Sequence, residues 1–192
     1  MNVWERKRLA ARDAIGEAAM TLALDKGFDA VRVEDIARVA AVSPRTFNNY
    51  FSSKEAAVVS VAFSRASQLT AEFAARPASE DLWHALGSAF AQVFPPNADW
   101  QRQARLIRET PALAAEQLKA FAAIELELAG EIARRTGARA DDLDSRLAAA
   151  AAVTTVRVVT DHFLVAGFDE TFVQTLQDTL TRFGTGLSAH GS

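Results

Sequence analysis

Apolar residues recur with a helical period along nearly the whole chain. Between residues 5 and 26, Ile15, Ala18, Ala19 and Leu22 stand at positions i, i+3, i+4 and i+7, which marks one face of an α-helix. Apolar and polar residues rarely alternate over strand-length runs. The pattern therefore predicts an all-α protein.

Turn residues divide this pattern into about nine helices. Gly27 is a natural left-handed residue after the first helix, Pro95 and Pro96 end the fifth, and Ser79 is expected to cap the start of that fifth helix. The expected helices cover residues 5–26, 33–40, 44 to about 50, 54–76, 80–94, 98–109, 111–136, 141–166 and 170–187.

The second and third of these helices are too short to bury a face alone, so they are expected to pack crosswise. Ser43 can cap the third helix, with Pro44 as its first residue. Polar donors and an aromatic ring in such a helix suit contact with the bases and phosphates of DNA. The residues expected on its outward side are Arg45, Thr46, Asn48, Asn49 and Tyr50.

In this region the sequence closely resembles the DNA-binding domain of TetR/AcrR-type regulators, whose pattern is approximately IA..AGVS..T.Y.YF..KE.L. The matching residues here are Ile36-Ala37, Ala40-Ala41-Val42-Ser43, Thr46-Phe47, Tyr50-Phe51 and Lys54-Glu55. The resemblance implies a helix-turn-helix domain over residues 1–53 and a ligand-binding and dimerisation domain over 54–192. Ala41 stands where the family usually has a turn glycine, which questions the turn geometry more than the function.

The same resemblance assigns roles on operator double-stranded DNA. It implies that Thr46 and Tyr50 touch the DNA backbone, that Arg45 approaches bases or phosphate, and that Lys54 meets phosphate, with Asn49 as a further candidate. The run Glu5-Arg6-Lys7-Arg8, followed by Arg12, either reaches neighbouring DNA or is a solubilising start to the helix. Ordinary solvated helix positions are the alternative for each residue.

Composition narrows the functional classes. Residues 1–54 hold nine Lys and Arg against seven Asp and Glu, whereas the remainder holds 12 against 17, so a weakly basic end precedes an acidic body. The chain has no cysteine, and its three histidines lack metal-protease spacing, which argues against an enzyme. No metal or cofactor is expected. A helical adaptor without DNA binding is the remaining alternative.

The second half offers aromatic residues for an apolar ligand, with ordinary core packing as the alternative. Arg157, Asp161 and His162 lie on a helix that is otherwise apolar, where an internal ion pair, a ligand contact and a surface position all remain open. Arg105 belongs to a basic ridge with Arg102 and Arg108 that is either solvated or binds an anionic group. The aromatic candidates are Trp83, Phe90, Phe94, Trp100, Phe121 and Phe163.

A short stretch, residues 105–117, also resembles the ligand domain of actinobacterial regulators that bind acyl-CoA-like molecules. The resemblance implies a small-molecule effector of that kind.

The final helices are expected to pair two copies into a homodimer, with Phe172, Leu176, Leu180 and Phe183 as the paired face. The most apolar run, residues 147–159, contains Arg157 and is shorter than the roughly 18 residues that span a membrane. We therefore expect a cytoplasmic protein with no membrane partner.

Overall fold

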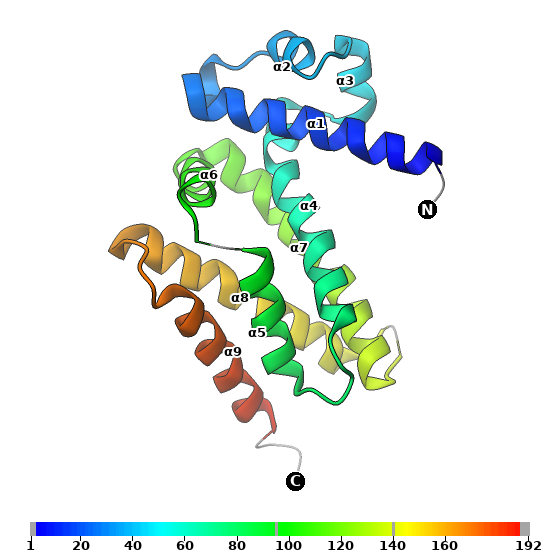
Figure 1. The fold of residues 1–192 in the computed structure, drawn as a ribbon, viewed down its shortest axis with the longest axis vertical. Coiled ribbons are helices and arrows are strands. Elements are labelled where there is room, and N and C mark those ends of the chain that lie inside the picture. The colour runs from blue at the N-terminus through cyan, green and yellow to red at the C-terminus, as the bar shows by residue number, and fades with distance from the viewer. Residues whose placement is uncertain (1–2, 95, 140, 189–192) are drawn as a thin grey trace. The chain divides into compact units, whose positions relative to one another are not determined.

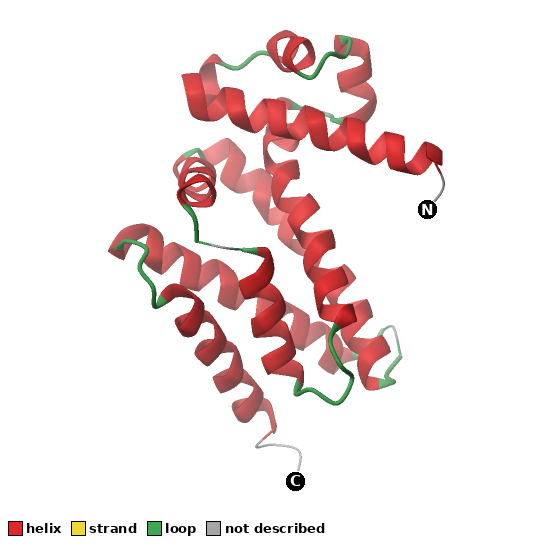
Figure 2. Cartoon of the chain, viewed as in Figure 1, coloured by secondary structure: helices red, strands yellow, loops and turns green. Residues whose placement is uncertain are grey.

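The structure is a computed structural model that describes residues 3–94, 96–139 and 141–188. Within these ranges it contains nine α-helices, one short 3₁₀ helix and no strand, which confirms the all-α prediction (Figures 1 and 2). The elements in chain order are α1 (Val3–Lys26), η1 (Phe28–Ala30), α2 (Val33–Val39), α3 (Pro44–Tyr50), α4 (Lys54–Ala75), α5 (Leu82–Val93), α6 (Ala98–Glu109), α7 (Pro111–Thr136), α8 (Leu143–Ala166) and α9 (Phe172–Ser188).

The expected helix boundaries lie close to the observed ones because caps and breakers are local signals. The one misassigned cap is that of α5. Its N-cap is Asp81 rather than Ser79, and the Asp81 carboxylate accepts hydrogen bonds from the backbone N–H groups of Trp83 and His84, each 3.0 Å long. A carboxylate also favours the positive end of the helix dipole, so Asp81 holds the first turn better than a serine two residues earlier.

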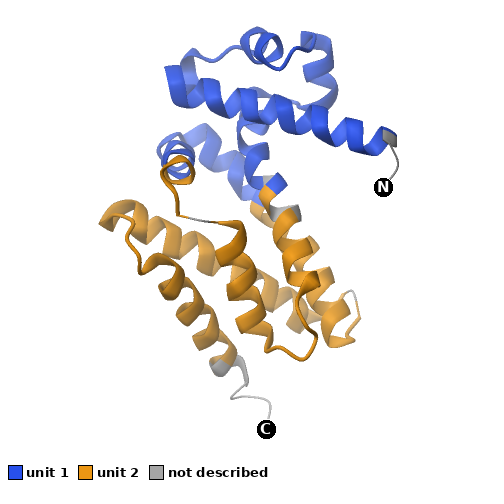
Figure 3. Ribbon diagram, viewed as in Figure 1, with its two compact units in different colours: residues 1–64, 102–120 blue, residues 65–101, 121–192 orange. Residues whose placement is uncertain are grey.

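The chain forms two compact units (Figure 3). Unit 1 comprises Met1–Ser64 and Arg102–Ala120, and unit 2 comprises Arg65–Gln101 and Phe121–Ser192. In unit 1, α1 packs against η1 and α2, around a core that includes Ile15, Ile36 and Phe47. In unit 2, α5 and α8 both pack against α9. Each unit thus has a hydrophobic core of its own.

Two arginines hold the loop that joins α4 to α5: Arg76 pairs with Glu80 inside the loop, and Arg135 reaches it from α7. The guanidinium of Arg135 on α7 donates hydrogen bonds to the carbonyl groups of Arg76, Pro77 and Glu80, at 3.2, 2.6 and 2.8 Å. It also lies over the Phe73 ring, 5.2 Å from the centroid. These carbonyl groups follow the end of α4 at Ala75, so Arg135 joins three points of this loop to α7.

α8 is long and apolar enough, by composition alone, to cross a membrane. The packing of α8 explains its apolar composition without a membrane. One face is buried in unit 2 through residues such as Ala149, Ala152 and Phe163, whereas Leu147, Val158 and Val165 on another face are 50%, 52% and 74% exposed. α8 therefore has one apolar face in the core and a second that the described part of the chain leaves exposed.

Candidate functional site

The turn between α2 and α3 has the geometry of a Schellman motif. The N–H of Val42 donates to the carbonyl of Ala37 at 2.9 Å, and the N–H of Ala41 donates to the carbonyl of Arg38 at 3.3 Å. Ala41 has a φ of 54°, in the left-handed region that favours glycine. The alanine thus adopts the usual glycine conformation, and the sharp turn of a helix-turn-helix is kept.

Helix α3 is fixed by a cap at its start and by an aromatic anchor on its inner face. The Ser43 hydroxyl accepts the backbone N–H of Thr46 at 3.0 Å, and the two hydroxyl groups lie 2.8 Å apart. Phe47 is fully buried and packs against Phe51 with ring centroids 5.8 Å apart. With that face turned inward, the opposite face presents Arg45 and Asn49 to solvent.

The other residues predicted to contact DNA have side chains that already make contacts within unit 1. Thr46 and Tyr50 are half-buried, and the Thr46 hydroxyl forms a hydrogen bond with the hydroxyl of Ser43, the N-cap of α3. The Lys54 ammonium donates to the carbonyl groups of Phe28 and Val31, at 3.1 and 3.0 Å, and lies 4.3 Å from the centroid of the Phe28 ring. Lys54 therefore anchors η1 to the start of α4, a role that the sequence pattern did not predict. An ammonium carries three hydrogens, which leaves one for a phosphate.

An ion-pair cluster holds α1 against α2. The Asp35 carboxylate accepts from Lys26 at 2.9 Å and from Arg38 at 2.7 Å. These two hydrogen bonds, with Lys26 contributing most, lower the pKa of Asp35 from 3.8 to about 2. The cluster fixes the first helix of the helix-turn-helix pair to the end of α1.

The aromatic candidates of the second half all belong to unit 2, where most are core residues. Trp83, Phe90 and Trp100 are 7%, 2% and 6% exposed, and Phe163 is also buried. Phe94 and Phe121 are half-buried against the same core. Core packing therefore accounts for most of these rings, as the alternative interpretation held.

Sequence reasoning missed Phe168, which lies between α8 and α9. Its ring centroid lies 5.2 Å from those of Trp100 and Phe172 and 5.8 Å from that of Phe163. Phe168 completes an aromatic cluster at this end of α8. Because it stands in a loop, no helical stripe could identify it.

The charged candidates lie largely at the surface. Arg157 and His162 are exposed and Asp161 is half-buried, so α8 carries these charges outside the core rather than as an internal ion pair. The reason is that α8 buries a narrower face than its composition suggests. Arg105 is exposed, belongs to unit 1, and lies 3.8 Å from Glu109.

The expected dimerisation stripe on α9 requires correction. Phe172, Leu176 and Leu180 are at most 1% exposed and lie in the core of unit 2, whereas Phe183 is 43% exposed. The stripe is internal because α9 packs closely on α5, where Trp83 stacks on Phe183 with ring centroids 6.4 Å apart. These three residues therefore cannot form a free surface for a second copy.

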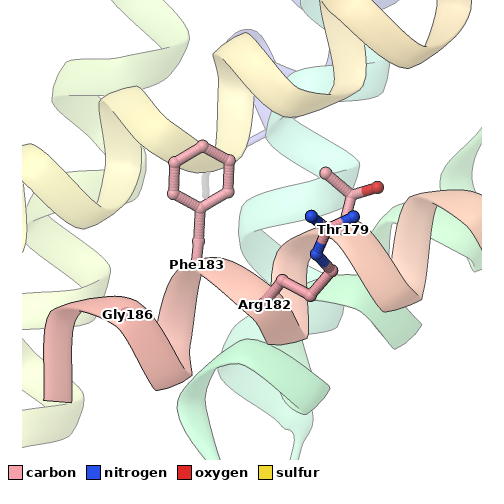
Figure 4. A pocket seen from close by; sticks show the side chains of 4 residues that line it. All are labelled: Thr179, Arg182, Phe183 and Gly186. Carbon is pink, nitrogen blue, oxygen red and sulfur yellow. The ribbon is translucent and has the colours of Figure 1, made fainter. Parts of the chain in front are cut away.

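A second stripe on α9 does face outward. Thr179, Arg182, Phe183 and Gly186 stand at positions i, i+3, i+4 and i+7 and line an open groove of about 410 Å³. Figure 4 shows the Phe183 ring standing out from the helix, with Arg182 and Thr179 beside one another.

Comparison with known sequences decides the family. Residues 15–61 match the profile described as bacterial regulatory proteins of the tetR family. Residues 76–188, more than half of the 192 residues, match the MftR C-terminal domain of the same family. The chain belongs to the TetR family. Members of this family are transcription regulators, and the resemblance seen in the sequence is confirmed.

Individual relatives share parts of this TetR-family chain. The HTH-type transcriptional regulator TcmR of Streptomyces glaucescens is 32% identical over 148 residues, which cover 72% of this chain and 66% of TcmR, just under two thirds of its length. Among solved structures, FadR of Thermus thermophilus in complex with lauroyl-CoA is 22% identical, with a TM-score of 0.59 over 88% of this chain and 91% of that one. The multidrug binding protein EbrR with malachite green is 18% identical, with a TM-score of 0.57 over 89% and 96%. These two structures support the fold.

Proposed function

We propose that this TetR-family protein is a homodimeric cytoplasmic repressor that binds operator DNA through α3 and leaves it when an apolar effector binds. One observation carries the DNA-binding part: after a left-handed turn at Ala41, a capped α3 buries Phe47 and exposes Arg45 and Asn49. An exposed face of this kind can enter the major groove, where Arg and Asn recognise guanine and adenine edges.

The experiment uses the full chain and duplexes that it recovers from a randomised DNA pool. Arg45→Ala and Asn49→Ala are expected to relax the recovered sequence and to lower the affinity by roughly tenfold each, since a good base contact contributes 1–3 kcal/mol. Lys119→Ala removes a charge from an exposed side chain on α7 and is the matched control. Unchanged sequence preference in both α3 variants would contradict this role for α3.

Thr46, Tyr50 and Lys54 are proposed to contact the DNA backbone, which carries no sequence information directly. Tyr50→Phe should therefore weaken binding to every duplex by a similar factor. Lys54→Ala should lower the slope of log affinity against log salt by about one unit. Because Lys54 also bonds two carbonyl groups of unit 1, circular dichroism must first show that this variant is folded.

The effector is proposed to be an apolar molecule, with acyl-CoA-like compounds as the first candidates. The complex of FadR with lauroyl-CoA and that of EbrR with malachite green support this class. In unit 2, the Thr160 hydroxyl is buried and has no hydrogen-bond partner among the described residues. A carbonyl or hydroxyl group of a ligand would satisfy it, since buried polar groups otherwise cost stability.

Lauroyl-CoA and free coenzyme A are the probes for the effector proposal. We expect lauroyl-CoA to change the fluorescence of Trp83 or Trp100 and to lower operator affinity, and the operator should lower lauroyl-CoA affinity by the same factor. Thr160→Val keeps the side-chain shape and should weaken lauroyl-CoA binding. Lauroyl-CoA that binds without changing operator affinity would contradict release by this ligand.

The other proposed ligand contacts need their own comparison. Phe94 and Phe121, the half-buried rings of unit 2, are proposed to meet the apolar part of the ligand. Exposed Arg105, in unit 1, is proposed independently as a contact for an anionic group. Arg105→Ala should weaken lauroyl-CoA but leave malachite green, which has no anionic group, unaffected. Equal effects on both ligands would remove Arg105 from the ligand contacts.

The homodimer is proposed to form through the outward faces of α8 and α9. Leu147, Val158 and Val165 recur on one face of α8, and Phe183 stands in the open groove of α9. A cluster of exposed apolar residues of this kind is rare on a monomeric protein and typical of helix-bundle pairing. A two-fold axis would place the same face of a second copy against it.

A further inference from the structure

Each end of α4 is held by a cation that binds main-chain carbonyl groups and lies over a phenylalanine ring. At the start of the helix, in unit 1, Lys54 binds the carbonyl groups of Phe28 and Val31 and lies over the Phe28 ring. At its end, in unit 2, Arg135 binds the loop between α4 and α5 and lies over the Phe73 ring. The two contacts share one chemistry, and each fixes one end of α4 to its own unit.

The contact in unit 2 fixes the direction of α4 as well as its place. Leu69 and Phe73 are fully buried in the core of unit 2, but such apolar packing is non-directional. The guanidinium of Arg135 is planar and presents its N–H groups in a rigid fork, which here bonds three carbonyl groups of one loop. The N–H of Glu80 closes that loop onto the carbonyl of Pro77 at 3.1 Å. Arg135 therefore sets the direction of the last turns of α4 against α7.

A small change in this direction has a large effect at the other end of the helix. α4 has 22 residues and is therefore roughly 33 Å long. A tilt of about 6° at its end displaces its start by about 3.4 Å, the rise of one DNA base pair. Val58 and Val59, near the start of α4, lie in the same core as Phe47 of α3. α3 is therefore expected to move with the start of α4.

We propose that Arg135 is a positioning residue for operator binding: by fixing the direction of α4, it sets the separation of the two α3 helices in the homodimer. It acts through α4 and is not itself a DNA contact. A homodimer must present its recognition helices about 34–36 Å apart to reach two half-sites one helical turn apart. The inference rests on the proposed function and adds the residue that selects the half-site spacing.

The test uses the full chain and an operator duplex recovered from the randomised pool, together with two versions in which one base pair is inserted or removed between the half-sites. Each change shifts a half-site by about 3.4 Å and turns it by about a tenth of a helical turn. The unchanged protein should lose roughly tenfold or more in affinity for the altered duplexes, because it no longer engages both half-sites together. Arg135→Ala should bind the original duplex more weakly, and its three affinities should differ by less than about threefold.

Two further variants separate positioning from a general loss of structure. Arg134→Ala is the matched control, since Arg134 is the adjacent residue of α7, is exposed and pairs with Glu131 of the same helix. It should keep the spacing preference of the unchanged protein. Arg135→Lys keeps the charge and loses the fork, so its preference should be intermediate. Because each preference is a ratio of affinities, a loss of folded protein lowers all three values together and cannot flatten it.

The outcomes distinguish this inference from the function on which it rests. If Arg135→Ala discriminates among the three duplexes as sharply as Arg134→Ala does, the inference is overturned. Where Arg135→Ala does not fold, an undiminished preference in Arg135→Lys contradicts the inference equally. If the unchanged protein recovers no duplex with two half-sites, the proposed function itself fails.

Discussion

At the scale of single residues, Ala41 carries a cost that the family pattern avoids. Its φ of 54° brings the alanine Cβ close to the backbone, and this conformation costs an L-residue about 1–2 kcal/mol. Removing this strain with Ala41→Gly should therefore raise the free energy of unfolding by about 1 kcal/mol. The extra conformational entropy of glycine in the unfolded chain offsets part of this gain. Urea unfolding followed by circular dichroism at fixed protein concentration measures the change.

Gly27 provides the reverse substitution. It has a φ of 80° at the end of α1 and no atom within 4 Å of the position that a Cβ would take. Its ψ of 143° places it in a region almost confined to glycine, so Gly27→Ala should lower the free energy of unfolding by about 1–3 kcal/mol through backbone strain. If both variants change stability in the same direction, left-handed strain is not the cause.

Asp35 makes stability depend on pH in the acidic range. Its pKa is about 2 in the folded chain, against an ordinary value of 3.8, because it accepts hydrogen bonds from Lys26 and Arg38. The folded state therefore gains stability from this carboxylate above pH 3.8 and loses it as the pH falls towards about 2. Asp35→Asn should flatten the fall in the free energy of unfolding over this range. A direct check is NMR titration, in which Lys26→Met should raise the pKa of Asp35.

At the scale of helices, α5 and α9 approach each other through a glycine. A Cβ on Gly184 would lie 2.1 Å from the Trp83 ring, whereas Gly130 on α7 has open space around it. Gly184→Ala should lower the free energy of unfolding by about 2 kcal/mol because a rigid ring must shift. Gly130→Ala should instead raise it by about 1 kcal/mol through helix propensity. Thermal unfolding of the two variants tests this, and equal destabilisation would contradict the close packing.

At the scale of the whole molecule, a charge on the exposed face of α8 and one on the buried face of α9 should have different effects. The first should abolish dimerisation and the second should unfold the protein. Val165→Glu alters a residue that is 74% exposed, so the chain should stay folded and become monomeric in sedimentation. Leu180→Glu buries a charge at a fully buried position and should unfold unit 2. Operator affinity should fall in the folded monomer because two half-sites are no longer held together.

Leu126→Glu is the control, since Leu126 on α7 is 71% exposed and lies outside the proposed pairing face. This variant should remain a dimer with unchanged operator affinity. A dimeric Val165→Glu variant would place the pairing surface elsewhere on the molecule.

The sequence alone determined most of the local structure. Helix periodicity, Pro44 after Ser43 and the spacing from Ile36 to Lys54 predicted the α2–α3 pair, because caps, turns and helical stripes act over a few residues. It also placed Arg45 and Asn49 on the outward side of α3, opposite the buried Phe47, whereas Thr46 and Tyr50, predicted on the same side, are half-buried.

Tertiary structure decided what covers each apolar face. The stripe of Phe172, Leu176 and Leu180 is equally consistent with a core and with a dimer surface, and only the packing of α9 on α5 shows that it is internal. The same holds for Lys54, whose bonds to Phe28 and Val31 join residues more than 20 positions apart. A periodic pattern identifies an apolar helix face that is removed from water. It does not identify the surface that covers this face, because that surface comes from residues far away in the sequence.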